Sequence, residues 1–139
     1  MRIIGFNFNK INIEKFSDKI EKLKINTNIN ISEIKEMELD LFKTKEQFIR
    51  VKFTYNIDYE PKMAKIELVG NIVFGAESKI AKDVLKQWEG KKIPEDFKII
   101  LFNVILRKSN LKALQLEEEL NLPLHISLPS LKKQENKEN

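Results

Sequence analysis

The stretch FIRVKFTYNIDY, residues 48–59, decides the fold of this chain of 139 residues. From Ile49 to Tyr59 every odd-numbered residue is apolar and every even-numbered residue is polar, which is the alternation of a strand with one buried face. After a turn at residues 60–62, the alternation resumes on even-numbered positions from Ala64 to Phe74. The two segments therefore predict an antiparallel hairpin with a longish turn.

Two further strands are predicted upstream of the hairpin. Residues 37–42 alternate apolar and acidic side chains, which indicates a strand that ends before a turn at residues 43–45. Residues 4–8 also alternate, and the phase then shifts by one residue at Ile11, as a β-bulge or short turn requires. In residues 14–31 some apolar residues recur at helical spacing and others alternate with polar residues. We therefore interpret this part as an extended connection that is either helix or strand.

Downstream of the hairpin the spacing of the apolar residues changes from the two-residue period of a strand to the period of a helix. Apolar residues from 80 to 88 fall on one helical face, and Gly90 ends this helix. A second helix begins at Pro94 and runs to Asn121. If residues 107–110 do not break this helix, it spans roughly 40 Å and projects beyond the width of a four-stranded sheet. We expect the projecting part to pack against a partner helix. Strands followed by helices predict the α+β class.

The C-terminal part divides into an apolar segment and a charged tail. Residues 122–131 alternate apolar side chains around two prolines, which favours an extended edge segment over a central strand. His125 is predicted to point away from the apolar face as a surface histidine. Residues 132–139 are charged, and we expect them to be disordered. We therefore predict a single domain over residues 1–131.

The residue types exclude most kinds of active site. With no cysteine and one histidine, the chain lacks thiol nucleophiles and the usual metal ligands, and its four glycines form no phosphate-binding loop. Glu38 and Asp40 lie about 7 Å apart on one strand face, beside Glu36, and we interpret them as solvated rather than catalytic. Residues 117–119 are interpreted in the same way. We expect no enzymatic activity, no metal and no other cofactor.

Charge and hydropathy limit the partners. No apolar run approaches the roughly 18 residues that span a bilayer, and the start of the chain lacks the pattern of a signal peptide, so we expect a cytoplasmic protein. The net charge is +4, but arginine occurs only at positions 2, 50 and 107, and lysines alternate with glutamates as on a solvated face. A basic nucleic-acid-binding module is therefore the second hypothesis, and a non-catalytic assembly subunit is the third.

The stretches at residues 34–41, 64–74, 97–120 and 121–129 together resemble the SecB family of protein-export chaperones. The stretch IKEMELDL at residues 34–41 is similar to the family's acidic strand, and AKIELVGNIVF at residues 64–74 is similar to the glycine and phenylalanine pattern of its third strand. Residues 97–120 resemble the long helix of the family. The stretch NLPLHISLP at residues 121–129 resembles the proline-punctuated loop that connects its helices.

The resemblance implies a SecB-like fold and a chaperone function. The fold would be a four-stranded antiparallel sheet with two helices packed on one face, one of them long, assembled through the long helix and the first strand into a dimer of dimers. The function would be that of an ATP-independent holdase that binds unfolded or precursor polypeptide, either in protein export or for a dedicated client such as an antitoxin.

The resemblance also implies site residues, which partly coincide with apolar edge elements that lack enough partners within one chain. The family's docking surface for the SecA translocase motor would map onto Glu38 and Asp40. The client-binding grooves would be lined by Phe6, Phe8, Leu122, Leu124, Ile126 and Leu128.

Overall fold

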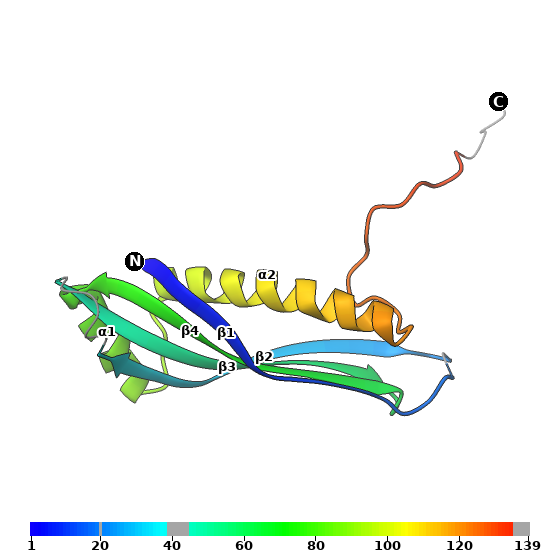
Figure 1. The fold of residues 1–139 in the computed structure, drawn as a ribbon, viewed down its shortest axis with the longest axis horizontal. Coiled ribbons are helices and arrows are strands. Elements are labelled where there is room, and N and C mark those ends of the chain that lie inside the picture. The colour runs from blue at the N-terminus through cyan, green and yellow to red at the C-terminus, as the bar shows by residue number, and fades with distance from the viewer. Residues whose placement is uncertain (20, 39–44, 135–139) are drawn as a thin grey trace.

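The sheet consists of four long antiparallel strands. The structure is a computed structural model and describes residues 1–19, 21–38 and 45–134. In chain order its elements are β1 (Arg2–Lys15), β2 (Lys24–Met37), β3 (Glu46–Glu60), β4 (Ala64–Glu77), α1 (Ser78–Glu89) and α2 (Glu95–Glu119) (Figure 1). The strand order is β1-β4-β3-β2, so β3 and β4 are central and β1 and β2 are the edges. The predicted α+β class, with a four-stranded antiparallel sheet and a long second helix, is confirmed.

The central hairpin buries the face that its alternation predicts. In β3 the odd-numbered residues from Ile49 to Tyr59 are at most 1% exposed, and in β4 the even-numbered residues from Ala64 to Phe74 are all buried. These side chains form one hydrophobic cluster with residues of both helices. The core therefore lies between the sheet and the helical layer, with α2 lying along the sheet (Figure 1).

Gly70 in β4 allows aromatic side chains of β1 and β3 to meet. It pairs with Phe8 on one side and with Phe53 on the other. A Cβ atom at position 70 would lie 2.6 Å from the carbonyl oxygen of Asn7 and 2.7 Å from Cζ of Phe53. Because that space is free, the Phe53 ring lies 5.5 Å from the ring of Phe6 and 6.4 Å from that of Phe8, between centroids. The packing therefore attaches the edge strand β1 to the centre of the sheet.

The edge strands contain the irregularities that make the first forty residues hard to interpret. In β1 the register shifts between Phe8 and Lys10, which confirms the predicted change of phase. Of the strand predicted at residues 37–42, the structure places Met37 as the last residue of β2, which begins at Lys24, and residues 39–42 lie outside the described residues. A register shift between Ile31 and Glu33 interrupts the alternation of β2, so that the next buried residue after Ile31 is the even-numbered Ile34. Residues 39–44 lie outside the described residues.

Both helices occur where the period predicts them. α1 ends at Gly90, and α2 continues without a break through residues 107–110. Not all of the apolar side chains of α2 reach the core, since Ile100 is 41% exposed and Leu111 is 62% exposed. The residues that face the sheet recur mainly every fourth position, from Phe97 to Ala113, so other apolar side chains are left on the outer surface. Among the described residues, no helix has both the length and the apolar character that crossing a bilayer requires.

Candidate functional site

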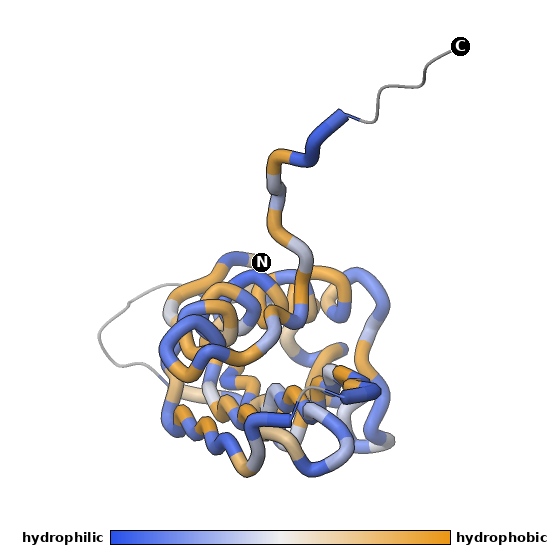
Figure 2. Tube along the Cα trace, turned by 90° about the vertical axis from the view of Figure 1, so that its right-hand side faces the viewer, coloured by the Kyte–Doolittle hydropathy of each residue, from blue (hydrophilic) through white to orange (hydrophobic). Residues whose placement is uncertain are grey.

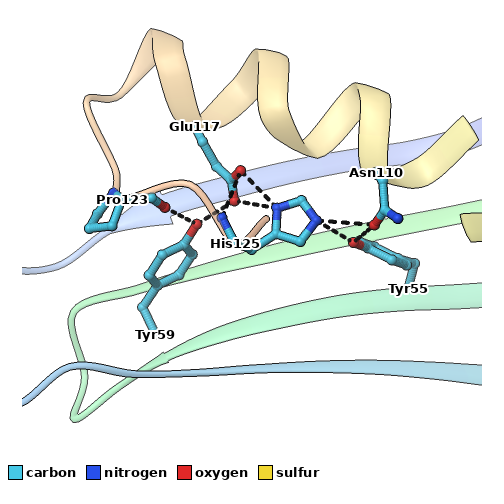
Figure 3. Close-up of polar contacts among 6 residues, drawn as sticks. All are labelled: Tyr55, Tyr59, Asn110, Glu117, Pro123 and His125. Carbon is cyan, nitrogen blue, oxygen red and sulfur yellow. Dashed lines mark hydrogen bonds and ion pairs between the residues drawn. The ribbon is translucent and has the colours of Figure 1, made fainter. Parts of the chain in front are cut away.

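A buried cluster of polar side chains joins α2, β3 and the segment that follows α2 (Figure 3). The Glu117 carboxylate accepts a hydrogen bond from the Tyr59 hydroxyl, and its two oxygens lie 2.8 and 2.9 Å from Nδ1 of His125. On the other side of the imidazole, Nε2 lies 3.1 Å from the Tyr55 hydroxyl and 3.0 Å from Oδ1 of Asn110. We call these five residues the polar anchor.

The electrostatics of the polar anchor keep its tyrosines protonated. Burial, and then the nearby Glu117 carboxylate, raise the pKa of both Tyr55 and Tyr59 far above the usual value of a phenol. Tyr55 donates to Oδ1 of Asn110 at 2.5 Å, and the Tyr59 hydroxyl also lies 2.8 Å from the carbonyl oxygen of Pro123. Each polar side chain of the cluster thus has a partner, which is what buried polar groups require. This arrangement fastens the C-terminal segment to the sheet.

The polar anchor corrects two predictions from the sequence. His125 is not a surface residue, because 3% of its side chain is exposed, and the Glu117 side chain is 0% exposed rather than solvated. Residues 120–134, the described residues after the helix, form no strand. Leu122 is buried at 5% exposure, which brings the residues that follow it over β3. The available signal was the pair of tyrosines on the buried face of β3, because buried phenol groups need hydrogen-bond partners.

Two grooves flank the helical layer, one at each edge of the sheet. The groove between β1 and α2, which we call the β1 groove, has a volume of about 650 Å³. Its apolar lining comes from Phe8, Ile11, Leu111 and Leu114. The groove at the other edge has a volume of about 700 Å³ and lies between β2, the end of α1 and the start of α2. We call it the β2 groove.

The residues predicted to bind clients fall into two groups. Phe6 and Phe8 are half-buried on β1, and Phe8 lines the β1 groove. The second group follows α2. Leu122 is buried, Leu124 is half-buried, and Ile126 and Leu128 are 37% and 54% exposed. Since β4 separates β1 from β3, the structure places the two groups over different strands rather than in one groove.

The C-terminal segment, residues 120–134, is held near its start by His125 of the polar anchor, and its later part projects away from the end of α2 (Figure 1). Apolar residues recur along this projecting segment (Figure 2), and Leu131 is fully exposed. For the predicted docking residues, Glu38 is exposed one residue beyond the end of β2, and Asp40 lies outside the described residues.

The arrangement of sheet and helices is the fold of SecB-like chaperones. No family model matches this sequence, and no curated protein matches it either. Among solved structures, the chain is similar to the SecB-like chaperone Rv1957 of Mycobacterium tuberculosis, which was solved in complex with a ChAD peptide from the Rv1956 HigA1 antitoxin. The TM-score is 0.54 and the identity 12%, over 94% of this chain and 89% of that chain. The likeness shows a SecB-like fold.

Proposed function

We propose that this protein is an ATP-independent holdase chaperone that binds unfolded or precursor polypeptide in an apolar groove. The fold it shares with a chaperone solved with an antitoxin peptide supports this function. The observation that carries the proposal is the β1 groove, because it combines an apolar lining with the outer edge of an edge strand. The client is an exported precursor or a dedicated partner such as an antitoxin.

The chemistry of the β1 groove suits an extended polypeptide. Within the described residues β1 is paired with β4 alone, so along its other edge the backbone is open to an added strand. Leu111 and Ile11 are 62% and 45% exposed, which is unusual for large apolar side chains that line one hollow. Lys108 and Lys112 line the same groove, where their aliphatic stems extend the apolar surface. A client would therefore bind through main-chain hydrogen bonds and through burial of every second side chain.

The projecting C-terminal segment adds a second apolar surface to this proposal. Ile126 and Leu128 follow directly after the polar anchor, which holds the base of the segment. We propose that they contact the client together with Leu124. In an export role, a translocase motor would dock at Glu38 and Asp40, which stays a prediction.

The β1 groove is tested by the variant Leu111→Glu in an aggregation assay. The purified protein, at a stoichiometric amount and without ATP, should suppress thermal aggregation of a reporter protein. Leu111→Glu places a charge in the groove and should abolish most of this suppression. Because the side chain is already exposed, the fold should persist, which circular dichroism checks.

The control variant is Phe16→Glu, since Phe16 has a similar exposure of 58% and does not line the β1 groove. It should suppress aggregation as well as the unmodified chain does. If the unmodified chain fails to suppress aggregation, the holdase function is wrong. If both variants suppress aggregation equally well, the β1 groove is not the client site. The double variant Ile126→Glu, Leu128→Glu tests the projecting segment in the same assay.

A further inference from the structure

We propose that the β2 groove is a second polypeptide site, which binds an extended segment in which apolar residues alternate with Asp or Glu. This site goes beyond the holdase function, because it lies at the opposite edge of the sheet from the β1 groove and selects its partner by charge. The floor of the groove is apolar and comes from four parts of the chain, with Ile31 in β2, Trp88 in α1, Ile93 after α1 and Phe102 in α2.

The rim of the β2 groove carries only positive charge. Lys91, Lys92 and Lys98 line it together with the apolar floor, and no carboxylate among the residues that the structure describes does so. Among the described residues, none of these three lysines forms an ion pair, although lysines elsewhere in the chain do. Three unpaired ammonium groups around an apolar hollow favour a partner that carries carboxylates beside apolar side chains.

The lysines are presented by a fixed turn of the backbone. Lys91 has φ 58°, a left-handed conformation that a lysine rarely adopts. The turn is held by hydrogen bonds from the Lys91 N–H to the Trp88 carbonyl at 2.8 Å and from the Lys92 N–H to the Gln87 carbonyl at 3.0 Å. The backbone from which the two lysine side chains start is therefore fixed before a partner arrives, so no backbone entropy is lost there on binding.

The partner is a polypeptide rather than a nucleic acid for two reasons. In the part of the chain that the structure describes, β2 is paired with β3 alone, so its outer edge next to Ile31 is open to an added strand. Single-stranded nucleic acid would need open aromatic faces for its bases. Here the ammonium groups of Lys91 and Lys98 lie 4.6 and 5.8 Å from the ring centroids of Trp88 and Phe102. The aromatic rings thus already have cations above them.

The fluorescence of Trp88 reports binding directly, because it is the only tryptophan in the chain. The probe is a synthetic peptide of about ten residues that alternates valine with glutamate, long enough to cover most of β2. It should shift the Trp88 emission in a saturable way. A peptide with lysine in place of glutamate, and a single-stranded oligodeoxynucleotide, should not.

The matched variants compare two pairs of lysines. Lys91→Glu with Lys98→Glu reverses the charge of the rim and should weaken binding of the acidic peptide at least about tenfold. Lys65→Glu with Lys82→Glu changes the net charge by the same amount at exposed positions outside the groove and should leave binding unchanged. Leu111→Glu should also leave it unchanged, which separates this site from the client site.

Three results would overturn the proposal. The first is that the acidic peptide produces no saturable change in Trp88 emission. The second is an equal loss of binding in both double variants, because the attraction would then be a property of the net charge alone. The third is binding of the oligodeoxynucleotide in preference to the peptide, which would make the β2 groove a nucleic-acid site.

Discussion

At the scale of single residues, His125 supplies the contact that holds the C-terminal segment to the body of the protein. Its imidazole faces the buried Glu117 carboxylate on one side and Tyr55 and Asn110 on the other. His125→Ala would leave a buried carboxylate with one partner fewer, so we expect the free energy of unfolding to fall by about 3 kcal/mol. Urea denaturation measures this change. Ser127→Ala, in the exposed part of the segment, should alter it by less than about 0.5 kcal/mol, and equal values for the two variants would contradict the anchor.

The two buried tyrosines make stability depend on alkaline pH. Because burial raises the pKa values of Tyr55 and Tyr59 in the folded chain above the usual value of about 10 for a tyrosine, the fold binds protons that the unfolded chain releases. The stabilisation that these raised pKa values provide is complete below about pH 10. As the pH rises further, the free energy of unfolding falls by up to about 1.4 kcal/mol per pH unit for each tyrosine.

The test uses the fact that these are the only two tyrosines in the chain. Tyrosinate absorbance should therefore appear together with unfolding rather than before it. In Tyr59→Phe the slope of stability against pH should be about half as steep, although the variant is less stable at neutral pH. Free ionisation of both tyrosines in the folded protein would show that the polar anchor is open.

At the scale of elements, Gly70 controls how firmly β1 is attached to the sheet. Gly70→Ala would push against backbone and against the Phe53 ring, so we expect a loss of about 1–3 kcal/mol. Hydrogen exchange should be accelerated most in β1. Gly5→Ala in β1 is the control, since a Cβ atom at that position has nothing within 4 Å, and it should be nearly neutral. Equal effects of the two variants would exclude the close approach at Gly70 as the cause.

The elements that the sequence predicted well are those whose pattern is local. The hairpin of β3 and β4 follows from the alternation of its residues, and the end of α1 follows from Gly90. Each of these signals lies within a few residues of the sequence. The extent of β2 was not predicted, since its register shift between Ile31 and Glu33 interrupts the alternation within one strand. The burial of His125 could not be predicted, because its partners Tyr55 and Asn110 lie 70 and 15 residues away in the sequence.

At the scale of the whole molecule, the sheet has two open edges with a groove at each, and α2 lies between them. A large apolar area outside the core remains on α2, where Ile99, Ile100 and Leu106 are 55%, 41% and 37% exposed. A helix with apolar side chains on all sides is usually buried. The outer surface of α2 is therefore a better candidate for self-association than the strand edges, and its use would leave both grooves open to polypeptide.

We accordingly expect the protein to form a homo-oligomer through α2, and a dimer of dimers is the arrangement that the resemblance to SecB implies. Static light scattering on the full chain should give the mass of more than one copy. Ile99→Glu with Leu106→Glu should reduce that mass while circular dichroism stays unchanged, because both side chains are exposed within one chain. Leu128→Glu, an equally exposed change in the projecting segment, should leave the mass unaltered. A monomeric unmodified chain would contradict the assembly, and a smaller mass for Leu111→Glu would mean that the β1 groove belongs to the interface between copies.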